Sequence, residues 1–152
     1  MIRRDASANG KAVIGWREFV GLPDWGIDAI RAKIDTGART SALHVEDLQL
    51  LPDGSVEFSV VVRREPEERR VVHAPLIRVT RIRSSAGVSR ERYVVATTLR
   101  IGTVDRVVEV GLVSRRRMLC RMLVGRLALG DDFLVDPTAR HLLGRGKRSK
   151  ES

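Results

Sequence analysis

One short stretch of this sequence combines the residue types needed for acid–base chemistry. It runs from Lys33 to Ala38, and within it Asp35 is followed by Thr36 and Gly37. A carboxylate at the end of an apolar strand is costly to desolvate unless it is hydrogen-bonded or shared with another group. Two interpretations follow, because short motifs match by chance: Asp35 is a catalytic acid/base, or it belongs to an ordinary strand-to-turn Asp-Thr-Gly.

Other kinds of chemistry find less support. His44, His73, His141 and Cys120 stand far apart, so no zinc-ligand spacing exists. The sequence has no Gly-x-Ser-x-Gly turn for a nucleophile and no Gly-rich phosphate loop. Two Trp, one Tyr and three Phe are too few for the base-stacking platform of common RNA-binding modules. We therefore predict no metal site, no cofactor and no specific nucleic-acid partner.

Composition limits the possible partners and compartment. The 152 residues are enough for one domain, and their net charge of +9 favours polyanions such as nucleic acid, acidic lipid or acidic peptide. No apolar run approaches the roughly 20 residues that span a membrane. The basic N-terminus lacks the apolar run of a secretory signal. With a single cysteine, an internal disulfide is excluded, and we predict a cytoplasmic protein without membrane association.

The elements that must position Asp35 are short strands. Apolar and β-branched runs alternate with turn signals every 8–12 residues, which predicts an all-β barrel. We count roughly nine strands and at most one or two short helices. Residues Ile27–Ile34 form the strand that leads into Asp35. Residues Met118–Val124 form another strand, which ends at Gly125 and Arg126.

Residues Thr80–Tyr93 predict a long, polar, two-stranded ribbon. The strand-like alternation continues on both sides of a turn made of Ser84, Ser85, Ala86 and Gly87. Most of its residues face solvent on either side, so little buried area holds it in place. We expect this ribbon to be mobile.

The pairing of these motifs resembles the retropepsin-like aspartic proteases. In that family an Asp-Thr-Gly-Ala turn supplies the catalytic aspartate, an apolar-Gly-Arg strand crosses behind it, and a flap hairpin lies between them. The segments Ala32–His44, Met122–Arg126 and Phe133–Pro137 are most similar to a bacterial and archaeal branch. Its members are named ATP-dependent zinc proteases and are associated with a ligase that adds glutamates to a ribosomal protein. The resemblance covers residues 11–144, between a flexible leader (1–10) and a disordered basic tail (145–152).

The resemblance implies a fold, a mechanism and an assembly. The fold is a closed acid-protease barrel, and one aspartate per chain requires a homodimer with two Asp35 carboxylates side by side. Two carboxylates that lie side by side cannot both be ionised, so they share one proton. The ionised carboxylate then activates a water, and the protonated one gives its proton to the scissile carbonyl. Thr36 would hydrogen-bond across the dimer axis, and Gly37 would let the substrate backbone approach.

The remaining site residues follow from the same resemblance. Ala38, Arg39 and the ribbon turn would bind substrate, and Gly125 with Arg126 would close the active-site loop. Retroviral members carry an acidic residue at the position of Arg39, where it can pair with the arginine of the Gly-Arg turn. We therefore expect Arg126 to pair with another acid, either Asp132 or Asp136.

Positive charge near the site favours acidic peptides. Arg39 and Lys33 make the surroundings of Asp35 more positive than in the retroviral pattern, which suggests substrates such as poly-glutamate. Two alternatives stay open. The first is a non-catalytic β-barrel of the same fold that binds acidic protein or RNA. The second is a zinc-dependent peptidase that uses His44, His73 or His141. The sequence supplies neither a metal-ligand spacing nor an ATP-binding loop to support it.

Overall fold

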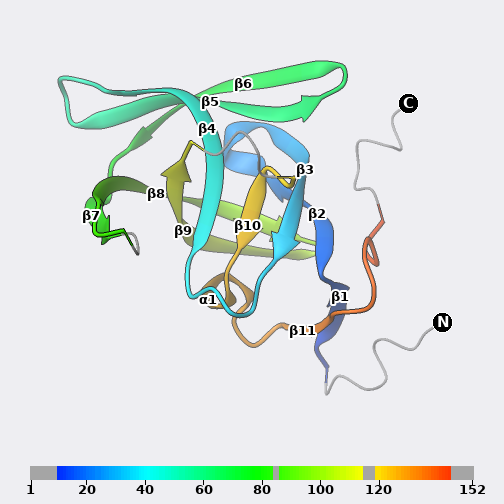
Figure 1. Cartoon of the computed structure of the whole chain (residues 1–152). Helices are drawn as coiled ribbons and strands as arrows, with labels where there is room; N and C mark the ends of the chain where they lie inside the picture. The colour runs from blue at the N-terminus through cyan, green and yellow to red at the C-terminus, as the bar shows by residue number, and fades with distance from the viewer. Residues whose placement is uncertain (1–9, 84–85, 115–118, 145–152) are drawn as a thin grey trace.

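The computed structural model describes residues 10–83, 86–114 and 119–144 (Figure 1). The predicted leader and basic tail therefore lie outside the described residues, apart from Gly10. In chain order the elements are β1 (Ala12–Gly15), β2 (Arg17–Leu22), the 3₁₀ turn η1 (Pro23–Trp25), β3 (Ile27–Ile34), β4 (Ser41–Leu50), β5 (Ser55–Arg64), β6 (Glu67–Pro75), β7 (Arg78–Arg83), β8 (Ser89–Ile101), β9 (Val104–Val113), β10 (Met122–Val124), α1 (Arg126–Leu129) and β11 (Phe133–Asp136).

Six strands close into a barrel in the order β10-β3-β2-β8-β9-β4 (Figure 1). The ring closes because β10 pairs in parallel with β3 and antiparallel with β4. The β5–β6 hairpin continues from β4, while β7 pairs with β8 as a ribbon at the edge of the barrel. A separate parallel pair joins β1 to β11. The predicted all-β barrel with at most one or two short helices is confirmed.

The strand assignments differ from expectation in two places. The described chain has eleven strands rather than roughly nine, partly because β2 runs on through Gly21 and the turn begins only at Pro23. Of the strand expected over Met118–Val124, Met118 lies outside the described residues, and the described part is a strand only at Met122–Val124. Before it, the chain bends, and the carbonyl of Arg121 accepts the backbone N–H of His44 at 2.9 Å. In the described part of the chain, no helix is long and apolar enough to cross a membrane.

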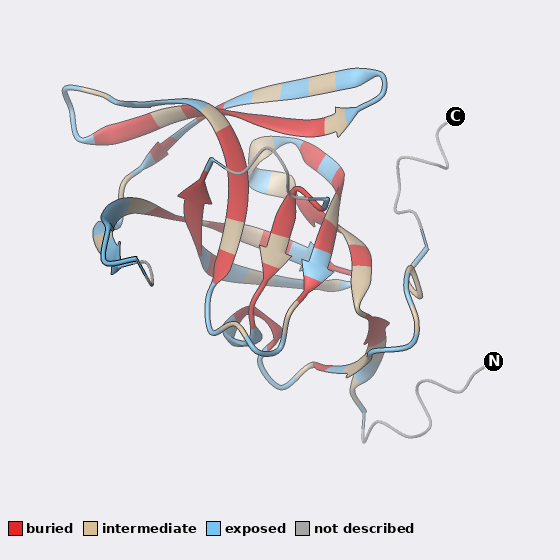
Figure 2. Ribbon diagram, in the orientation of Figure 1, coloured by how far each residue is buried: buried red, intermediate tan, exposed pale blue. Residues whose placement is uncertain are grey.

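The core lies inside the barrel (Figure 2). Strand β3 illustrates how the sequence builds it, since Ile30, Ala32 and Ile34 are buried while Lys33 is exposed. Successive side chains of a strand point to opposite faces, so this alternation turns one face of β3 inward. Its outward face is left for charged residues, and the strand delivers Asp35 at the end of the barrel.

Glu18 is a buried carboxylate that joins the two ends of the barrel domain. It is fully buried, and its Oε2 accepts the backbone N–H groups of Gly15 at 2.7 Å and Leu142 at 2.9 Å. Its Oε1 accepts the N–H of Leu143 at 3.1 Å. Three hydrogen bonds to an ionised acceptor compensate the cost of burying the charge. Glu18 thereby fixes the chain after β11 against the beginning of the barrel.

Replacing Glu18 by Gln should destabilise the fold, because an amide has one acceptor oxygen and would turn its NH₂ toward a backbone N–H. We expect the free energy of unfolding in urea to fall by about 2–4 kcal/mol, the usual cost of buried donors left unpaired. Glu109→Gln is the control, since Glu109 is an exposed partner of Arg78 and should change stability little. Equal losses in both variants would contradict this role for Glu18.

Candidate active site

Asp35 leaves the barrel where β10 passes between β3 and β4. The register places Val124 beside Ile34 on β3 and Met122 beside Leu43 on β4. The backbone N–H of Asp35 donates to the carbonyl of Val124 at 2.9 Å. Two segments far apart in the sequence therefore lie side by side, as the apolar-Gly-Arg resemblance implies (Figure 1).

The loop after β3 holds one oxygen of the Asp35 carboxylate. Oδ1 accepts the backbone N–H of Gly37 at 3.0 Å, and the carbonyl of Asp35 accepts the N–H of Ala38 at 3.2 Å. Asp35 is half-buried, whereas Thr36 and Gly37 are exposed. Within the described residues, Oδ2 accepts no hydrogen bond. The loop thus fixes the orientation of the carboxylate and leaves one oxygen available to another group.

Gly125 supports this loop from behind, and no side chain fits at its position. A Cβ there would lie 2.4 Å from the carbonyl oxygen of Thr40 and 2.9 Å from that of Ala38. The N–H of Gly125 donates to Oγ of buried Ser41 at 3.0 Å, and the N–H of Arg126 donates to the carbonyl of Ala38 at 2.8 Å. The close packing of two backbones therefore explains the glycine in the Gly-Arg pair.

The side chain of Arg126 contacts the loop backbone instead of an acid. Its Nη1 donates to the carbonyl of Gly37 at 3.4 Å. Asp132 pairs with Arg106, and Asp136 accepts hydrogen bonds from the turn that follows β11. The expectation that Arg126 pairs with Asp132 or Asp136 is therefore wrong. Each of these acids already has a local partner, and the loop carbonyl faces the guanidinium.

The expected substrate-binding residues fall into two groups. Ala38 is half-buried and Arg39 is exposed, and the carbonyl of Arg39 accepts the N–H of Leu127 at 3.2 Å. Both residues thus belong to the Asp35 loop. On the ribbon, Ala86 and Gly87 are exposed, while Ser84 and Ser85 lie outside the described residues.

The ribbon of β7 and β8 extends outward from the barrel in Figure 1, while the Asp35 loop lies at the base of the barrel. The register of the ribbon runs from Arg78 opposite Val94 to Arg83 opposite Ser89, so the predicted hairpin is present.

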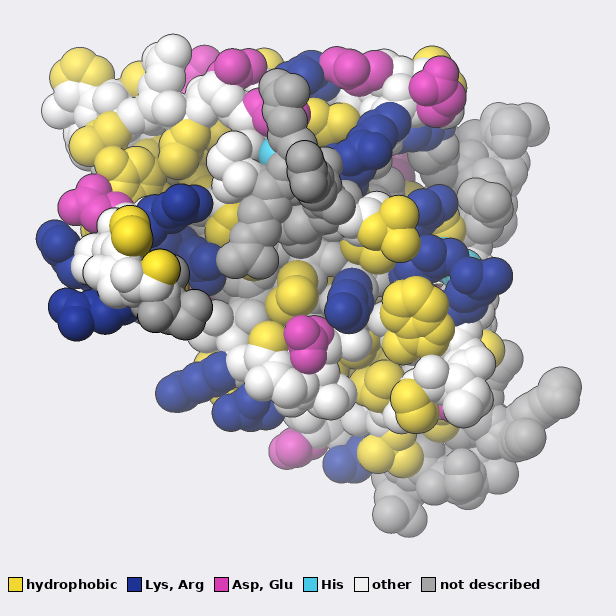
Figure 3. All heavy atoms as spheres, in the orientation of Figure 1, with side chains coloured by type: hydrophobic (Ala, Val, Ile, Leu, Met, Phe, Trp, Pro, Cys, Tyr) yellow, Lys and Arg dark blue, Asp and Glu magenta, His cyan; other side chains and the backbone are white. Residues whose placement is uncertain are grey.

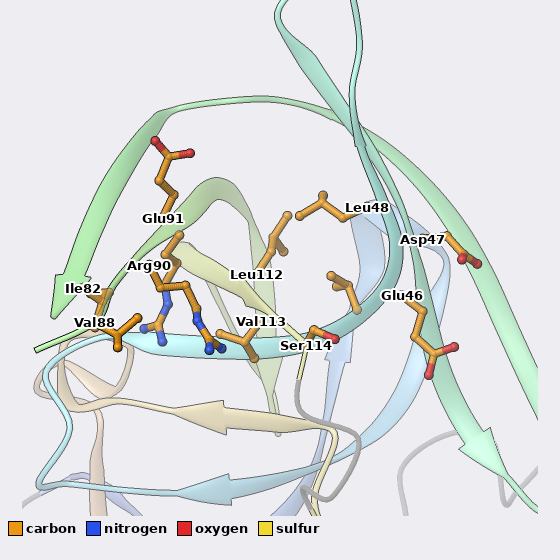
Figure 4. A pocket seen from close by; sticks show the side chains of 12 residues that line it. Glu46, Asp47, Leu48, Ile82, Val88, Arg90, Glu91, Leu112, Val113 and Ser114 are labelled. Carbon is orange, nitrogen blue, oxygen red and sulfur yellow. The ribbon is translucent and has the colours of Figure 1, made fainter. Parts of the chain in front are cut away.

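A hollow of about 520 Å³ lies where the ribbon meets the barrel (Figure 4). Ile82 and Val88 line it from the ribbon, and Leu48, Leu112 and Val113 line it from the barrel. Arginine and acidic side chains surround this apolar floor, and Asp35 is not among the lining residues. Sequence reasoning missed this hollow, because its walls come from four separate strands and no local motif marks them.

A second hollow of about 370 Å³ adjoins the catalytic motif. Thr36 and Arg126 line it together with apolar side chains from α1 and β11, including Leu129, Phe133 and Leu134. Leu134 is 43% exposed, although it lies beside the proposed site. The surface next to the Asp35 loop is therefore apolar and open.

The histidines do not gather into a metal site. His44 hydrogen-bonds with Glu46, His73 with Ser55, and His141 accepts from Arg17. No group of three or more potential ligands among His, Cys, Asp and Glu could hold a metal ion in the part of the chain that is described.

A closed β-barrel with an Asp-Thr-Gly-Ala loop backed by a Gly-Arg strand defines the retropepsin-like class of folds. Residues 13–145 match the family described as "Retropepsin-like aspartic endopeptidase RimB". The chain belongs to this RimB-like family, and the resemblance seen in the sequence is confirmed.

Similar proteins extend this assignment. A protein of Desulfotalea psychrophila named "Probable alpha-L-glutamate ligase" is 36% identical over 93% of this chain. A protein of the same name from Shewanella pealeana is 33% identical over 90% of the chain. The chain spans about a third of each of these relatives, 31% of their length. The crystal structure of a Legionella pneumophila protein of unknown function superposes with a TM-score of 0.71 at 25% identity, covering 87% of this chain and 98% of that one.

Replacing Gly125 by Ala should displace the Asp35 loop, because the new methyl group would overlap the carbonyl of Thr40. We expect a loss of about 1–3 kcal/mol in the free energy of unfolding, the range for overpacked sites. Gly54→Ala is the control: a Cβ there meets open space, so only its left-handed backbone conformation opposes the change, at about 1–2 kcal/mol. Activity distinguishes the two variants: Gly125→Ala should abolish any activity that needs Asp35, whereas Gly54→Ala should leave it unchanged.

Proposed function

We propose that this chain is one half of an aspartic endopeptidase, and that its active site forms when two copies bring their Asp35 carboxylates together across a two-fold axis. The observation that carries this proposal is the loop of Asp35, which orients the carboxylate through Oδ1 and leaves Oδ2 without a partner within the described residues. Membership of the RimB-like family supports it.

The chemistry follows from two carboxylates in contact. Because like charges about 3 Å apart cannot both ionise, the pair holds one proton. The ionised carboxylate takes a proton from a water as the water oxygen attacks the carbonyl carbon of the peptide bond. The protonated carboxylate donates its proton to the carbonyl oxygen. When the C–N bond then breaks, the dyad gives its proton to the leaving amine and takes one from a hydroxyl of the tetrahedral gem-diol, so it again holds one proton.

The surface beside Thr36 supports assembly with a second copy. Thr36 is exposed, and it borders the apolar hollow that includes Phe133 and Leu134. Burial of such apolar surface is the main driving force for stable association. In the dimer, Thr36 hydrogen-bonds across the axis, and the ribbon of each chain closes over the peptide. The hollow at the base of the ribbon then receives a substrate side chain.

The charges near the loop support an acidic peptide as substrate. Arg39 and Lys33 are exposed, and neither forms an ion pair with an acidic side chain in the described chain. Arg126 likewise has no acidic partner among the described residues, and its Nη1 donates to the carbonyl of Gly37. Poly-glutamate matches this surplus of positive charge. The relatives named for glutamate ligation support a role beside such a ligase, in which this chain removes residues of the kind that a ligase adds.

Replacing Asp35 by Asn should lower hydrolysis of a poly-glutamate peptide by at least about 100-fold, because the dyad loses its acid–base groups. Product formation resolved by chromatography measures this. Asp28→Asn is the matched control, since Asp28 is an exposed aspartate on the same strand and should leave hydrolysis unchanged.

Mixing chains separates a shared site from a monomeric one. When wild-type chain is mixed with an excess of the Asp35→Asn chain, mixed dimers carry one carboxylate, so activity per wild-type chain should fall. Constant activity per wild-type chain would contradict the shared dyad. Loss of activity with a chelator, together with full activity of the Asp35→Asn chain, would favour a zinc peptidase instead.

Replacing Arg39 by Glu should reduce the preference for acidic peptides. We expect the ratio of kcat/KM for poly-glutamate to that for a neutral peptide of equal length to fall about fivefold, the effect of an exposed charge contact. Arg100→Glu provides the control, because Arg100 pairs with Asp105 on the β8–β9 hairpin. An unchanged ratio in the Arg39→Glu variant would remove the charge argument and leave the dyad mechanism intact.

A further inference from the structure

Four cationic side chains gather on the outer face of the sheet formed by β2, β3 and β10. Arg17 lies opposite Lys33, two residues beyond Arg31 on β3. Residues at alternate positions of a strand share a face, and so do residues opposite each other on neighbouring strands. Arg121 directly precedes β10, which pairs with β3. We name this set of Arg17, Arg31, Lys33 and Arg121 the cationic face.

The same four charges act on the thiol of Cys120. Burial raises the pKa of this thiol, and the charges of Arg17, Arg31, Lys33 and Arg121 act in the opposite direction. This agrees with the strand register, which brings side chains from β2, β3 and the start of β10 together on one sheet. Figure 3 shows Lys and Arg side chains gathered over the part of the barrel that contains β2 and β3.

Half of the other described arginines, seven of fourteen, form ion pairs with acids. Ion pairs with Asp or Glu occupy Arg63, Arg69, Arg70, Arg78, Arg81, Arg100 and Arg106. By contrast, none of the four side chains of the cationic face has an ion pair with a described acidic residue. The local surplus of positive charge is therefore greater than the net charge alone indicates.

Two arginines of the cationic face are partly or largely withdrawn from solvent. Arg121 is only 7% exposed, and its side chain has no hydrogen bond or ion pair to another described residue. Burial lowers the pKa of Arg121, and the charges of Arg64 and Arg31 act in the same direction, whereas Cys120 and Glu46 oppose them. The Nε of Arg31 is also buried without a described hydrogen-bond partner. An anion bound on this face would relieve both costs.

The stacking of the arginines indicates the kind of anion. The guanidinium of Arg31 lies over the ring of Phe19 at 5.8 Å, and that of Arg17 lies over Trp16 at 5.2 Å. Phe19 also stacks on His141, with ring centroids 4.9 Å apart. Bases of single strands stack on guanidinium planes and aromatic rings, while guanidinium groups bind phosphate through two hydrogen bonds. Carboxylate side chains of a peptide offer no ring for such stacking.

We propose that the cationic face binds single-stranded nucleic acid without sequence preference, through contacts of its arginines and Lys33 with phosphates and of the stacked planes with bases. The stacking planes are supplied largely by arginine, which is why the small number of aromatic residues does not exclude this site. The site shares Lys33 with the proposed peptide-binding surface, but it uses neither the Asp35 carboxylate nor a second chain, so it does not depend on peptidase activity.

The test is fluorescence anisotropy of a labelled oligouridylate of about 12 nucleotides with the full chain. Affinity should fall about 20- to 50-fold between 50 and 200 mM salt if three or four phosphates are contacted. The double variant Arg17→Gln/Lys33→Gln should bind about tenfold more weakly and show a shallower salt dependence. Arg78→Gln/Arg100→Gln removes the same net charge from ion-paired positions, and it should change affinity less than about twofold.

The outcomes separate the cationic face from its alternatives. Absence of binding by the wild-type chain, or equal losses in the two double variants, overturns the proposal. So does displacement of the oligouridylate by poly-glutamate at the same concentration of negative charge, because the face would then prefer an acidic peptide.

Because Arg17 contacts Trp16 and His141, Lys33→Gln alone serves as a variant that preserves packing and should still weaken binding. The Asp35→Asn chain should bind as tightly as the wild type, whether or not it is a peptidase.

Discussion

The insertion of β10 between β3 and β4 is the constraint on which the rest of the structure depends. It closes the barrel, since one short strand pairs with two neighbours in opposite senses. It also brings Val124 to the backbone of Asp35 and Gly125 against the next turn of the loop. A three-residue strand makes few hydrogen bonds of its own. The hydroxyl of Ser41, which accepts the N–H of Gly125, and the missing side chain of Gly125 therefore determine how closely β10 approaches the Asp35 loop. The same contact therefore sets the fold and the position of the carboxylate.

Much of this arrangement could be predicted from the sequence. Alternating β-branched residues separated by Gly, Pro and Asp-Gly turns carry a strong strand signal, and the pairing of Asp35-Thr36-Gly37 with Gly125-Arg126 identified the segments that meet. These signals are local, or they combine two local motifs. The strand β2 was harder to recognise, because Gly21 and Pro23 favour a turn and only its pairing with β3 shows where the strand ends.

Long-range side-chain contacts account for what the sequence did not predict. The partner of Arg126 depends on which group faces it after folding, and Asp132 is engaged by Arg106 from β9. The hollow beside the ribbon combines side chains from strands that are distant in the sequence. The burial of Glu18 could not be inferred either, since a Glu between Arg17 and Phe19 suggests a solvated position. Gly15 supplies one donor locally, but the other two come from the distant path of the chain at Leu142 and Leu143.

The cationic face and the Asp35 loop share one property, a local surplus of positive charge. Exposed ion pairs contribute little to stability, so the main effect of those on the β5–β6 and β8–β9 hairpins is to neutralise their surroundings. The outer face of β3 and the loop at its end are among the surfaces that remain positive. A field of this kind attracts any polyanion, so it cannot by itself separate a nucleic acid from an acidic peptide. Selection must come from contacts at short range. Stacked guanidinium planes on the sheet suit bases and phosphates, whereas the Asp35 loop presents a carboxylate, which repels phosphate.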